Sequence, residues 1–255
     1  MTIPRIYSPS ALEEGKPCRL ESDQVKYLKH VLRLPPGAPV IVFDGRGAEF
    51  AAHIKSFTPR FVEVELKKKI ETSERKIKIT LAQALPKAHK MDMIVRSAAE
   101  LGADEIIPFV AGRSVARISE EKSSEKVARW QKIAREAARC CRDPQIANVR
   151  PVASFDAVVA SEESGFVLKM IFWEEEEQKT IKDLLTNHSR LAVKNFFIIV
   201  GPEGGFTREE IAKAQKAGFT SVSLGRQILK AESAAAAIIT IIQYEKGIFS
   251  RASKR

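Results

Sequence analysis

Two loops of unusual composition lie about one βαβ unit apart in the C-terminal part of the chain. The first, residues 201–205, reads Gly-Pro-Glu-Gly-Gly and follows the apolar run 196–200. The second, residues 224–233, reads Leu-Gly-Arg-Gln-Ile-Leu-Lys-Ala-Glu-Ser. Glycines in the first loop permit positive φ and close approach of a ligand, whereas its proline fixes φ and has no N–H group. This loop is therefore typical of a site that holds a ligand mainly through the backbone.

The motifs that usually bind phosphate groups are missing. The chain contains no Gly-x-x-x-x-Gly-Lys-Ser/Thr and no Gly-x-Gly-x-x-Gly, and Glu203 would repel a pyrophosphate. The histidines have no metal-ligand spacing with one another or with cysteine, so we expect no zinc or other metal. The chain has no Gly-x-Ser-x-Gly motif and no Cys–His pairing, so its sequence does not indicate a catalytic nucleophile. The loops thus favour a ligand with little negative charge.

Each loop needs a strand before it and a helix after it. The apolar, β-prone residues before the first loop predict a buried strand. Thr207 and Glu210 form a capping box, which predicts the start of a helix. Strands that end at one edge of a parallel sheet form a crevice for a ligand. The elements expected around the loops are a strand over 196–200, a helix over 208–218, a strand over 219–224 and a buried helix over 234–244.

From residue 75 onward, strand and helix patterns alternate along the chain. This alternation predicts an α/β domain with a parallel sheet that helices cover on both faces. The remaining expected elements are strands over 76–85, 105–109 and 166–173 and helices over 91–101, 124–141 and 181–187.

Residues 1–74 have a β-rich pattern instead. A hairpin over 39–57 and an alternating strand over 61–70 follow a short basic helix over 23–32. The polar segment 71–75 lacks apolar periodicity, so we place the domain boundary between residues 74 and 75. A small β-barrel with a basic helix is typical of an RNA-binding platform, although a solvated helix face explains the same charges.

The composition indicates what kind of partner the protein binds and in which cellular compartment it acts. The 255 residues carry a net charge of +10 with a pI near 9.5, which favours a polyanionic partner. A basic enzyme with a small substrate fits that charge nearly as well. Adjacent Cys140 and Cys141 point apart in a helix and cannot pair, which fits a reducing cytoplasm. No run reaches transmembrane length and no signal peptide opens the chain, so we expect a soluble cytoplasmic protein.

The two loop sequences together resemble the C-terminal motifs of the RsmE family of SPOUT-superfamily enzymes. These enzymes methylate N3 of a uridine in small-subunit (16S) ribosomal RNA. The family's second motif usually reads L-G-x-R-I-L-R-x-E-T-A, so Gln227, Lys230 and Ser233 are departures. Cys140 and Ala147 also replace the family's usual Gln and Pro. Shorter matches extend the resemblance over nearly the whole chain, at 5–7, 30–34, 43–45, 90–92, 99–102, 113–115 and 136–142.

The resemblance implies an architecture and a cofactor. Residues 1–74 would form a PUA-like RNA-binding β-barrel, and residues 75–255 a SPOUT methyltransferase domain with a parallel sheet and a deep trefoil knot. S-adenosyl-L-methionine would bind at the knot, in a homodimer interface, and leave as S-adenosyl-L-homocysteine. Its cationic sulfonium and neutral adenosine suit loops that offer carbonyls, amides and a carboxylate. The implied cofactor contacts are Trp173, Glu174, Val200, Gly201, Pro202, Glu203, Gly204, Gly205, Leu224, Gly225, Ile228, Leu229 and Ser233.

The resemblance also implies roles in RNA binding and proton removal. Arg226 is expected to hold RNA and to stabilise the uracil anion that forms when N3 loses its proton. Glu232 is expected to orient the base or accept that proton, although charge complementation at a helix N-terminus explains it as well. The implied RNA contacts are Arg5, His30, Arg33, Lys87, Arg113, Arg139 and Arg142.

Other functions stay open on the sequence alone. A SPOUT enzyme could modify another RNA position, such as a tRNA base or a 2′-hydroxyl. A non-catalytic RNA-binding factor in ribosome assembly would bind RNA without binding the cofactor. A small-molecule α/β enzyme with a basic surface would be indifferent to RNA and to salt. For the methyltransferase, the expected partner is small-subunit ribosomal RNA or the 30S particle, with no membrane partner.

Overall fold

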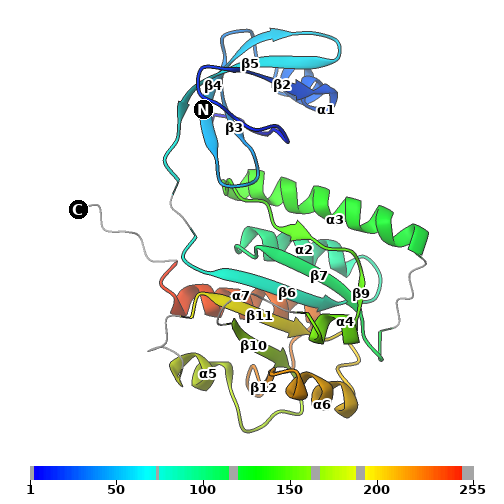
Figure 1. Cartoon of the computed structure of the whole chain (residues 1–255). Coiled ribbons are helices and arrows are strands. Elements are labelled where there is room, and N and C mark those ends of the chain that lie inside the picture. Colours follow the sequence, from blue (N-terminus) through cyan, green and yellow to red (C-terminus); the bar gives the residue numbers. More distant parts are fainter. Residues whose placement is uncertain (1–2, 73–74, 115–119, 162–166, 188–192, 249–255) are drawn as a thin grey trace. The chain divides into compact units, whose positions relative to one another are not determined.

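The computed structural model describes residues 3–72, 75–114, 120–161, 167–187 and 193–248 (Figure 1). The chain divides into two compact units. The first unit contains Met1–Glu74 and Arg135–Ile146, and the second contains Arg75–Ala134 and Ala147–Arg255. The long helix α3 (Glu120–Cys141) therefore contributes residues to both units.

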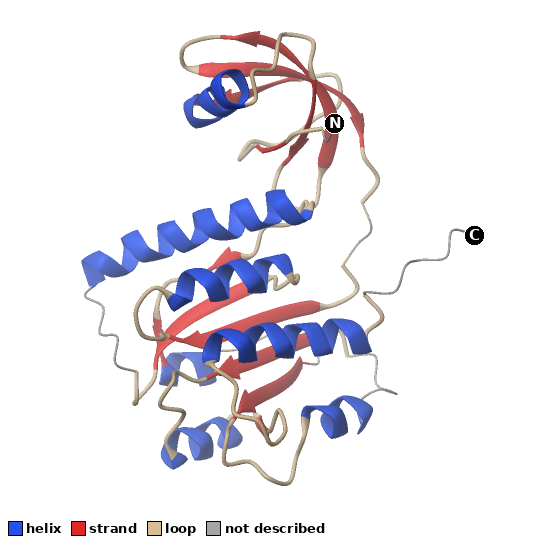
Figure 2. Ribbon diagram, turned by 180° about the vertical axis from the view of Figure 1, so that it is seen from behind, coloured by secondary structure: helices blue, strands red, loops and turns tan. Residues whose placement is uncertain are grey.

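The first unit is built on a curled five-stranded sheet (Figure 2). The strand order is β1-β3-β4-β5-β2, and the neighbouring pairs are antiparallel except β1 with β3. Alternate residues along the strands are buried, such as Val62, Val64 and Leu66 of β5, and together form one apolar core. The strands are β1 (Arg5–Tyr7), β2 (Pro17–Glu21), β3 (Pro39–Phe43), β4 (Glu49–Phe57) and β5 (Phe61–Lys69).

The predicted hairpin of this unit is confirmed as β3 and β4. Asp44 shapes the turn, because its Oδ1 accepts the N–H groups of Arg46 and Ala48 at 2.8 and 3.0 Å. The sequence pattern does not predict β1 and β2, because β1 has only three residues and β2 mixes charged with apolar residues. The short basic helix is confirmed as α1 (Ser22–Val25), which continues as the π-helix η1 (Lys26–Val31).

The second unit contains a seven-stranded sheet. Its order is β12-β10-β11-β6-β7-β8, and β9 also pairs with β7. The pairs between its described strands are all parallel, which confirms the predicted α/β class. The strands are β6 (Lys78–Ala84), β7 (Glu105–Val110), β8 (Asn148–Val149), β9 (Ala153–Ser154), β10 (Val167–Phe172), β11 (Asn195–Val200) and β12 (Thr220–Val222).

Helices cover both faces of this sheet. On one face α2 and α7 pack against each other, and α7 also contacts β6 and β11 (Figure 2). On the opposite face α4 and α6 contact each other, in front of the sheet in Figure 1. Burial from both sides explains why the central strand β11 is a continuous apolar run. The helices are α2 (Lys90–Glu100), α4 (Phe155–Val159), α5 (Ile181–Asn187), α6 (Arg208–Lys216) and α7 (Ala231–Glu245).

An aromatic cluster anchors the segment after β11 in the core. The ring centroid of Phe206 lies 6.5 Å from that of Phe109 and 5.8 Å from that of Phe155. Aromatic pairs of this kind contribute about 0.5–1.5 kcal/mol beyond their buried area. Phe206 directly follows the loop 201–205, so the end of that loop is fixed by the core.

Some elements differ from their predicted limits. Helix α7 begins at Ala231 rather than at 234, because the extended backbone of Lys230 already serves as its N-cap. Glu232 and Ser233 are therefore helical residues rather than loop residues. Strand β12 ends at Val222 rather than at 224, so the connection between β12 and α7 both begins and ends earlier than predicted. The sequence pattern also misses β8, β9 and α4, which are too short to show a hydrophobic period.

Candidate functional site

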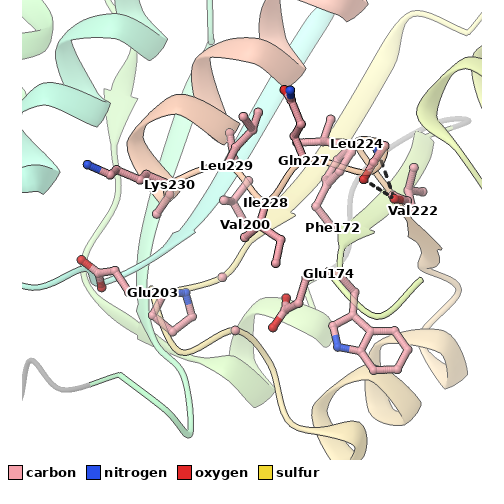
Figure 3. Close-up of a pocket in the computed structure, with 18 of the residues that line it drawn as sticks. Phe172, Glu174, Val200, Glu203, Val222, Leu224, Gln227, Ile228, Leu229 and Lys230 are labelled. Carbon is pink, nitrogen blue, oxygen red and sulfur yellow. Dashed lines mark hydrogen bonds between the residues drawn. The ribbon is translucent and has the colours of Figure 1, made fainter. Parts of the chain in front are cut away.

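A cavity of about 430 Å³ lies at the carboxyl ends of β10, β11 and β12 (Figure 3). These strands are neighbours in the sheet, so their ends meet at one edge, as the sequence predicts. The segments 172–174, 200–205 and 222–231 line the cavity together with Ala234. Residues 201–205 are termed the glycine loop below, and residues 224–230 the arginine loop.

The glycine loop is a tight turn that requires glycine at its end. The N–H of Gly205 bonds to the carbonyl of Pro202 at 3.0 Å, and Gly205 has a φ of +66°. A Cβ on Gly205 would lie 1.8 Å from Oε1 of Glu174, and one on Gly204 would lie 3.2 Å from Cβ of Arg113. A larger residue at position 205 would require the Glu174 side chain to move, and the left-handed backbone there disfavours it as well, whereas a larger residue at position 204 would press against Arg113.

Neighbouring side chains brace the glycine loop. Oγ1 of Thr207 accepts the N–H of Glu210 at 3.2 Å, and Oε2 of Glu210 accepts the N–H of Thr207 at 2.9 Å, which confirms the predicted capping box. Oε1 of Glu210 also accepts the N–H of Gly112 at 2.8 Å. In addition, Nη1 of Arg113 donates to the carbonyl of Gly204 at 3.0 Å. The segment after β7 thus holds the loop in place.

Glu203 of the glycine loop is engaged by lysines. Nζ of Lys90 lies 2.7 Å from its Oε1, and the N–H of Lys87 lies 3.2 Å from each carboxylate oxygen. Burial raises the pKa of Glu203, but the hydrogen bonds from Lys90 and Lys87 outweigh it and hold the pKa below its ordinary value. The hydrogen bond to Glu203 in turn raises the pKa of Lys90.

These shifts predict a pH window for the contribution of the Lys90–Glu203 pair to stability. The contribution is lost as pH falls through the lowered pKa of Glu203, and as pH rises through the raised pKa of Lys90. Glu232 also faces Lys90 and helps to keep it protonated. The melting temperature of the protein should therefore exceed that of a Glu203→Gln variant by a constant margin between about pH 5 and pH 10, and the margin should shrink outside this range. A margin that does not change with pH would contradict the prediction.

Trp173 and Glu174 offer unused polar groups at the cavity. Nε1 of Trp173 is buried and has no hydrogen-bond partner within the described ranges. The carboxylate of Glu174 lies against Gly205 and is not held by a cation of the described residues (Figure 3). A buried donor and an unpaired carboxylate are typical of a site that binds a ligand with an acceptor and a positive charge.

The arginine loop presents its side chains openly. Ile228 is 86% exposed and Leu229 is 38% exposed, which is unusual for apolar side chains beside a cavity. Gly225 has a φ of +109°, and its N–H bonds to Oγ of Ser223 at 3.1 Å. Arg226 is exposed and lines the cavity without an ion-pair partner among the residues described. The loop can thus meet both a ligand in the cavity and a larger partner outside it.

The cavity brings together most of the predicted cofactor residues. All of them except Ser233 line it, and so does Arg226. Ser233 and Glu232 lie in the first turn of α7 and are not among the lining residues. The sequence reasoning missed several lining residues, although most of them adjoin a predicted one in sequence and could have been found from the strand ends. They are Phe172, Val222, Ser223, Gln227, Lys230, Ala231 and Ala234.

The predicted RNA contacts fall in both compact units. Lys87 and Arg113 belong to the second unit and brace the glycine loop, as described above. His30, Arg33 and Arg142 are exposed in the first unit. In that unit Arg139 is oriented by Glu136, at 2.9 Å, and by the hydroxyl of Tyr27, at 3.2 Å, and its guanidinium also lies over the Tyr27 ring.

Arg5 differs from the other predicted RNA contacts. Its side chain is buried, forms an ion pair with Glu49 and lies over the ring of Phe43. Arg5 is in β1 and Glu49 is in β4, so the ion pair links these two strands. Removing the arginine would leave the carboxylate of Glu49 unpaired in the core. Arg5 therefore has a structural position, and its guanidinium is not presented to an RNA ligand.

Metal-binding clusters, membrane-spanning helices and disulfide bonds are not found in the described part of the chain. Within it, no group of three or more His, Cys, Asp or Glu residues is placed to hold a metal ion. None of its helices is long and apolar enough to cross a membrane. Cys18, Cys140 and Cys141 form no disulfide bonds.

Family models match both parts of the chain. An RNA methyltransferase domain model matches residues 73–243, and an RNA methyltransferase PUA domain model matches residues 20–67. The chain is 31% identical to ribosomal RNA small subunit methyltransferase E of Rickettsia conorii, over 95% of the chain and 96% of that protein. It is 29% identical to the protein of the same name from Bacillus subtilis, over 92% of each.

Solved structures give the same result. Ribosomal RNA small subunit methyltransferase E from Neisseria gonorrhoeae, bound to S-adenosyl methionine, superposes with a TM-score of 0.85 at 29% identity, over 95% of this chain and 98% of that one. A methyltransferase from Legionella pneumophila, in complex with the same cofactor, has a TM-score of 0.85 at 30% identity, over 96% and 98% of the two chains. Together with the cavity at the strand ends, these matches show that the chain belongs to the family of ribosomal RNA small subunit methyltransferase E.

Proposed function

We propose that this chain transfers a methyl group from S-adenosylmethionine to N3 of a uridine in small-subunit (16S) ribosomal RNA. The observation that carries the proposal is the cavity formed by the glycine and arginine loops. It lies in a chain that matches cofactor-bound relatives over 95% and 96% of its length. Its walls offer backbone groups and a carboxylate rather than a phosphate cradle, which suits a cationic cofactor with a neutral adenosine.

The residues present fit the cofactor. The partnerless Nε1 of Trp173 can donate to an acceptor of the ligand, and Glu174 can face a positive charge. The backbones of the glycine and arginine loops can approach closely because Gly205 and Gly225 carry no side chain. When bound, S-adenosylmethionine supplies an already activated methyl group, so the protein needs no nucleophile of its own.

The protein must instead help the uracil N3 lose its proton. Arg226 is exposed at the cavity and is not engaged by an acid in the described structure, so its guanidinium can stabilise the developing anion. Loss of such a group typically lowers a rate about 10²–10³-fold. Alignment of N3 with the methyl group supplies the remaining acceleration.

RNA binding is proposed for the exposed cations of both units. Arg33 and Arg142 are both exposed, and both have left-handed backbones, with φ of 52° and 63°. Replacing both with asparagine, which tolerates this conformation, should weaken binding to a small-subunit RNA fragment and reduce the salt slope of log K by roughly 1–2. Fluorescence anisotropy at several salt concentrations measures both quantities. Arg60→Asn, at an exposed turn of the same unit, is the control, and an equal effect there would contradict specific contacts.

A homodimer is also part of the proposal. Tyr244 of α7 is 71% exposed and Met93 of α2 is 56% exposed, on two helices that pack together. Exposed apolar side chains on adjoining helices favour a self-complementary interface. Tyr244→Glu should convert the dimer to a monomer in light scattering, whereas Lys182→Glu on α5 should not. A dimer that survives Tyr244→Glu would contradict this interface.

The proposed domains are residues 1–74 as the PUA-like RNA-binding domain and residues 75–255 as the methyltransferase domain. A trefoil knot is proposed for the latter. Strand β12 is at the sheet edge, yet α7 contacts β11 and β6, so the arginine loop must return across the ends of β10 and β11. Because its substrate is ribosomal RNA, we place the protein's action in the cytoplasm, on RNA or on the 30S particle.

Cofactor titration and RNA modification together test this function. Calorimetry should detect saturable binding of S-adenosylmethionine, and incubation with small-subunit RNA should yield 3-methyluridine. RNA binding without cofactor binding would instead indicate a non-catalytic assembly factor. A methylated tRNA or a 2′-O-methyl product would indicate a related enzyme with another target.

A further inference from the structure

Lys90 contacts both the glycine loop and the first turn of α7, which directly follows the arginine loop. Its Nζ lies 2.7 Å from Oε1 of Glu203 in the glycine loop and 3.7 Å from Oε2 of Glu232. Glu232 is in the first turn of α7, directly after the arginine loop. Lys90 itself is the first residue of α2. One side chain from a third segment thus contacts an acid at each loop.

The backbone before α2 supports this arrangement. The N–H of Lys87 lies 3.2 Å from both carboxylate oxygens of Glu203. Ala88, which follows it, has a φ of 56°, a left-handed conformation that disfavours a non-glycine residue. Ala88 lies in sequence between Lys87 and Lys90. Its left-handed backbone turns the chain so that the N–H of Lys87 and Nζ of Lys90 both reach the carboxylate of Glu203.

The carboxylates of both acids face the ammonium group of Lys90. Glu203 lies at the edge of the cavity, on the same side as Lys230 (Figure 3), and its carboxylate is occupied by Lys87 and Lys90. Glu232 is not a lining residue of the cavity. Its Oε2 is buried, has no hydrogen-bond partner in the described structure and faces the ammonium group of Lys90.

We infer that Lys90 is a positioning residue that fixes the glycine and arginine loops relative to each other, and that Glu203 and Glu232 act through it. The effect on cofactor binding rests on the proposed function, whereas the effect on the loops does not. In this inference Glu203 and Glu232 are partners of Lys90, whereas the family resemblance implies a cofactor contact for Glu203 and an orienting or proton-accepting role for Glu232.

Hydrogen exchange of the cofactor-free protein tests the loops directly. In Lys90→Met, amides in both 201–206 and 224–231 should exchange about tenfold faster or more than in the wild type. Lys90→Arg keeps the charge and should restore most of the protection. The matched control is Lys213→Met, which removes an exposed lysine that lies 2.9 Å from Asp156 in the same unit. Faster exchange in only one loop, or in neither, would overturn the inference.

Kinetics then separate positioning from catalysis. Lys90→Met should weaken S-adenosylmethionine binding about tenfold, while the rate at saturating cofactor stays within about threefold of the wild type. Glu232→Gln should have the same two effects. If it instead lowers the rate of methyl transfer about a hundredfold and leaves the hydrogen exchange of the loops unchanged, Glu232 is the base and the inference is overturned. If the wild type binds no cofactor, the proposed function fails, and the exchange result still decides the role of Lys90.

Discussion

Gly205→Val is expected to weaken S-adenosylmethionine binding by at least about 100-fold, because a branched side chain would force both the backbone and Glu174 to move. The added Cβ would lie 1.8 Å from Oε1 of Glu174, and the φ of +66° disfavours valine independently. Glu174 could rotate away, but it would then leave the place where the cavity offers its unpaired carboxylate. Isothermal titration calorimetry measures the loss.

Gly218→Val is the matched control for this prediction. Gly218 follows the C-cap of α6 with a φ of +85°, and a Cβ there would meet nothing within 4 Å. The two variants therefore share the backbone strain, and only the one at Gly205 changes the cavity. Should either valine variant fail to fold, Gly205→Ala and Gly218→Ala provide a milder pair. Equal cofactor affinity in both members of a pair would contradict the glycine loop as a cofactor site.

Arg226→Met is expected to lower the rate of methyl transfer by about 10²–10³-fold while cofactor affinity changes by no more than about threefold. Arg226 lines the cavity and has no acidic partner in the described chain, so under the proposed function its charge is available to the uracil anion. Raising the pH should recover part of the lost rate, because more uridine is then already deprotonated. Single-turnover assays with saturating cofactor and RNA report this step.

Two variants control the Arg226 prediction. Arg226→Lys keeps the charge but not the planar fork, and it should retain more activity than the methionine variant. Arg208→Met removes an exposed arginine of the same unit, one that pairs with Glu175 at 3.1 Å, and it should leave the rate unchanged. Full activity in Arg226→Met would contradict a catalytic role, as would a loss that merely tracks weaker cofactor binding.

The sequence predicts most of the fold because its signals are local. The run before the glycine loop is apolar throughout, and the capping box of Thr207 and Glu210 starts α6 where expected. Elements of two to five residues, such as β8, β9 and α4, are set by long-range pairing and packing, which no local period reports.

The sequence also locates the cavity, because both loops follow strands whose ends meet at one sheet edge. It does not reveal side-chain partners. The sequence predicts that Glu203 contacts a ligand, because it lies in the glycine loop. In the structure its carboxylate accepts a hydrogen bond from Lys90, which lies more than a hundred positions earlier in the chain. The sequence predicts that Arg5 contacts RNA at the surface, but in the structure its side chain is buried and forms an ion pair with Glu49. Such pairings depend on distant segments, so only the three-dimensional structure can assign these residues.

Transfer of a labelled methyl group tests the central claim most directly. Unmodified small-subunit RNA and reconstituted 30S particles would be incubated with the protein and methyl-labelled S-adenosylmethionine, digested to nucleosides and analysed by mass spectrometry. We predict label in 3-methyluridine and its loss in Arg226→Met. Label in another nucleoside, or none with either substrate, would contradict the assignment.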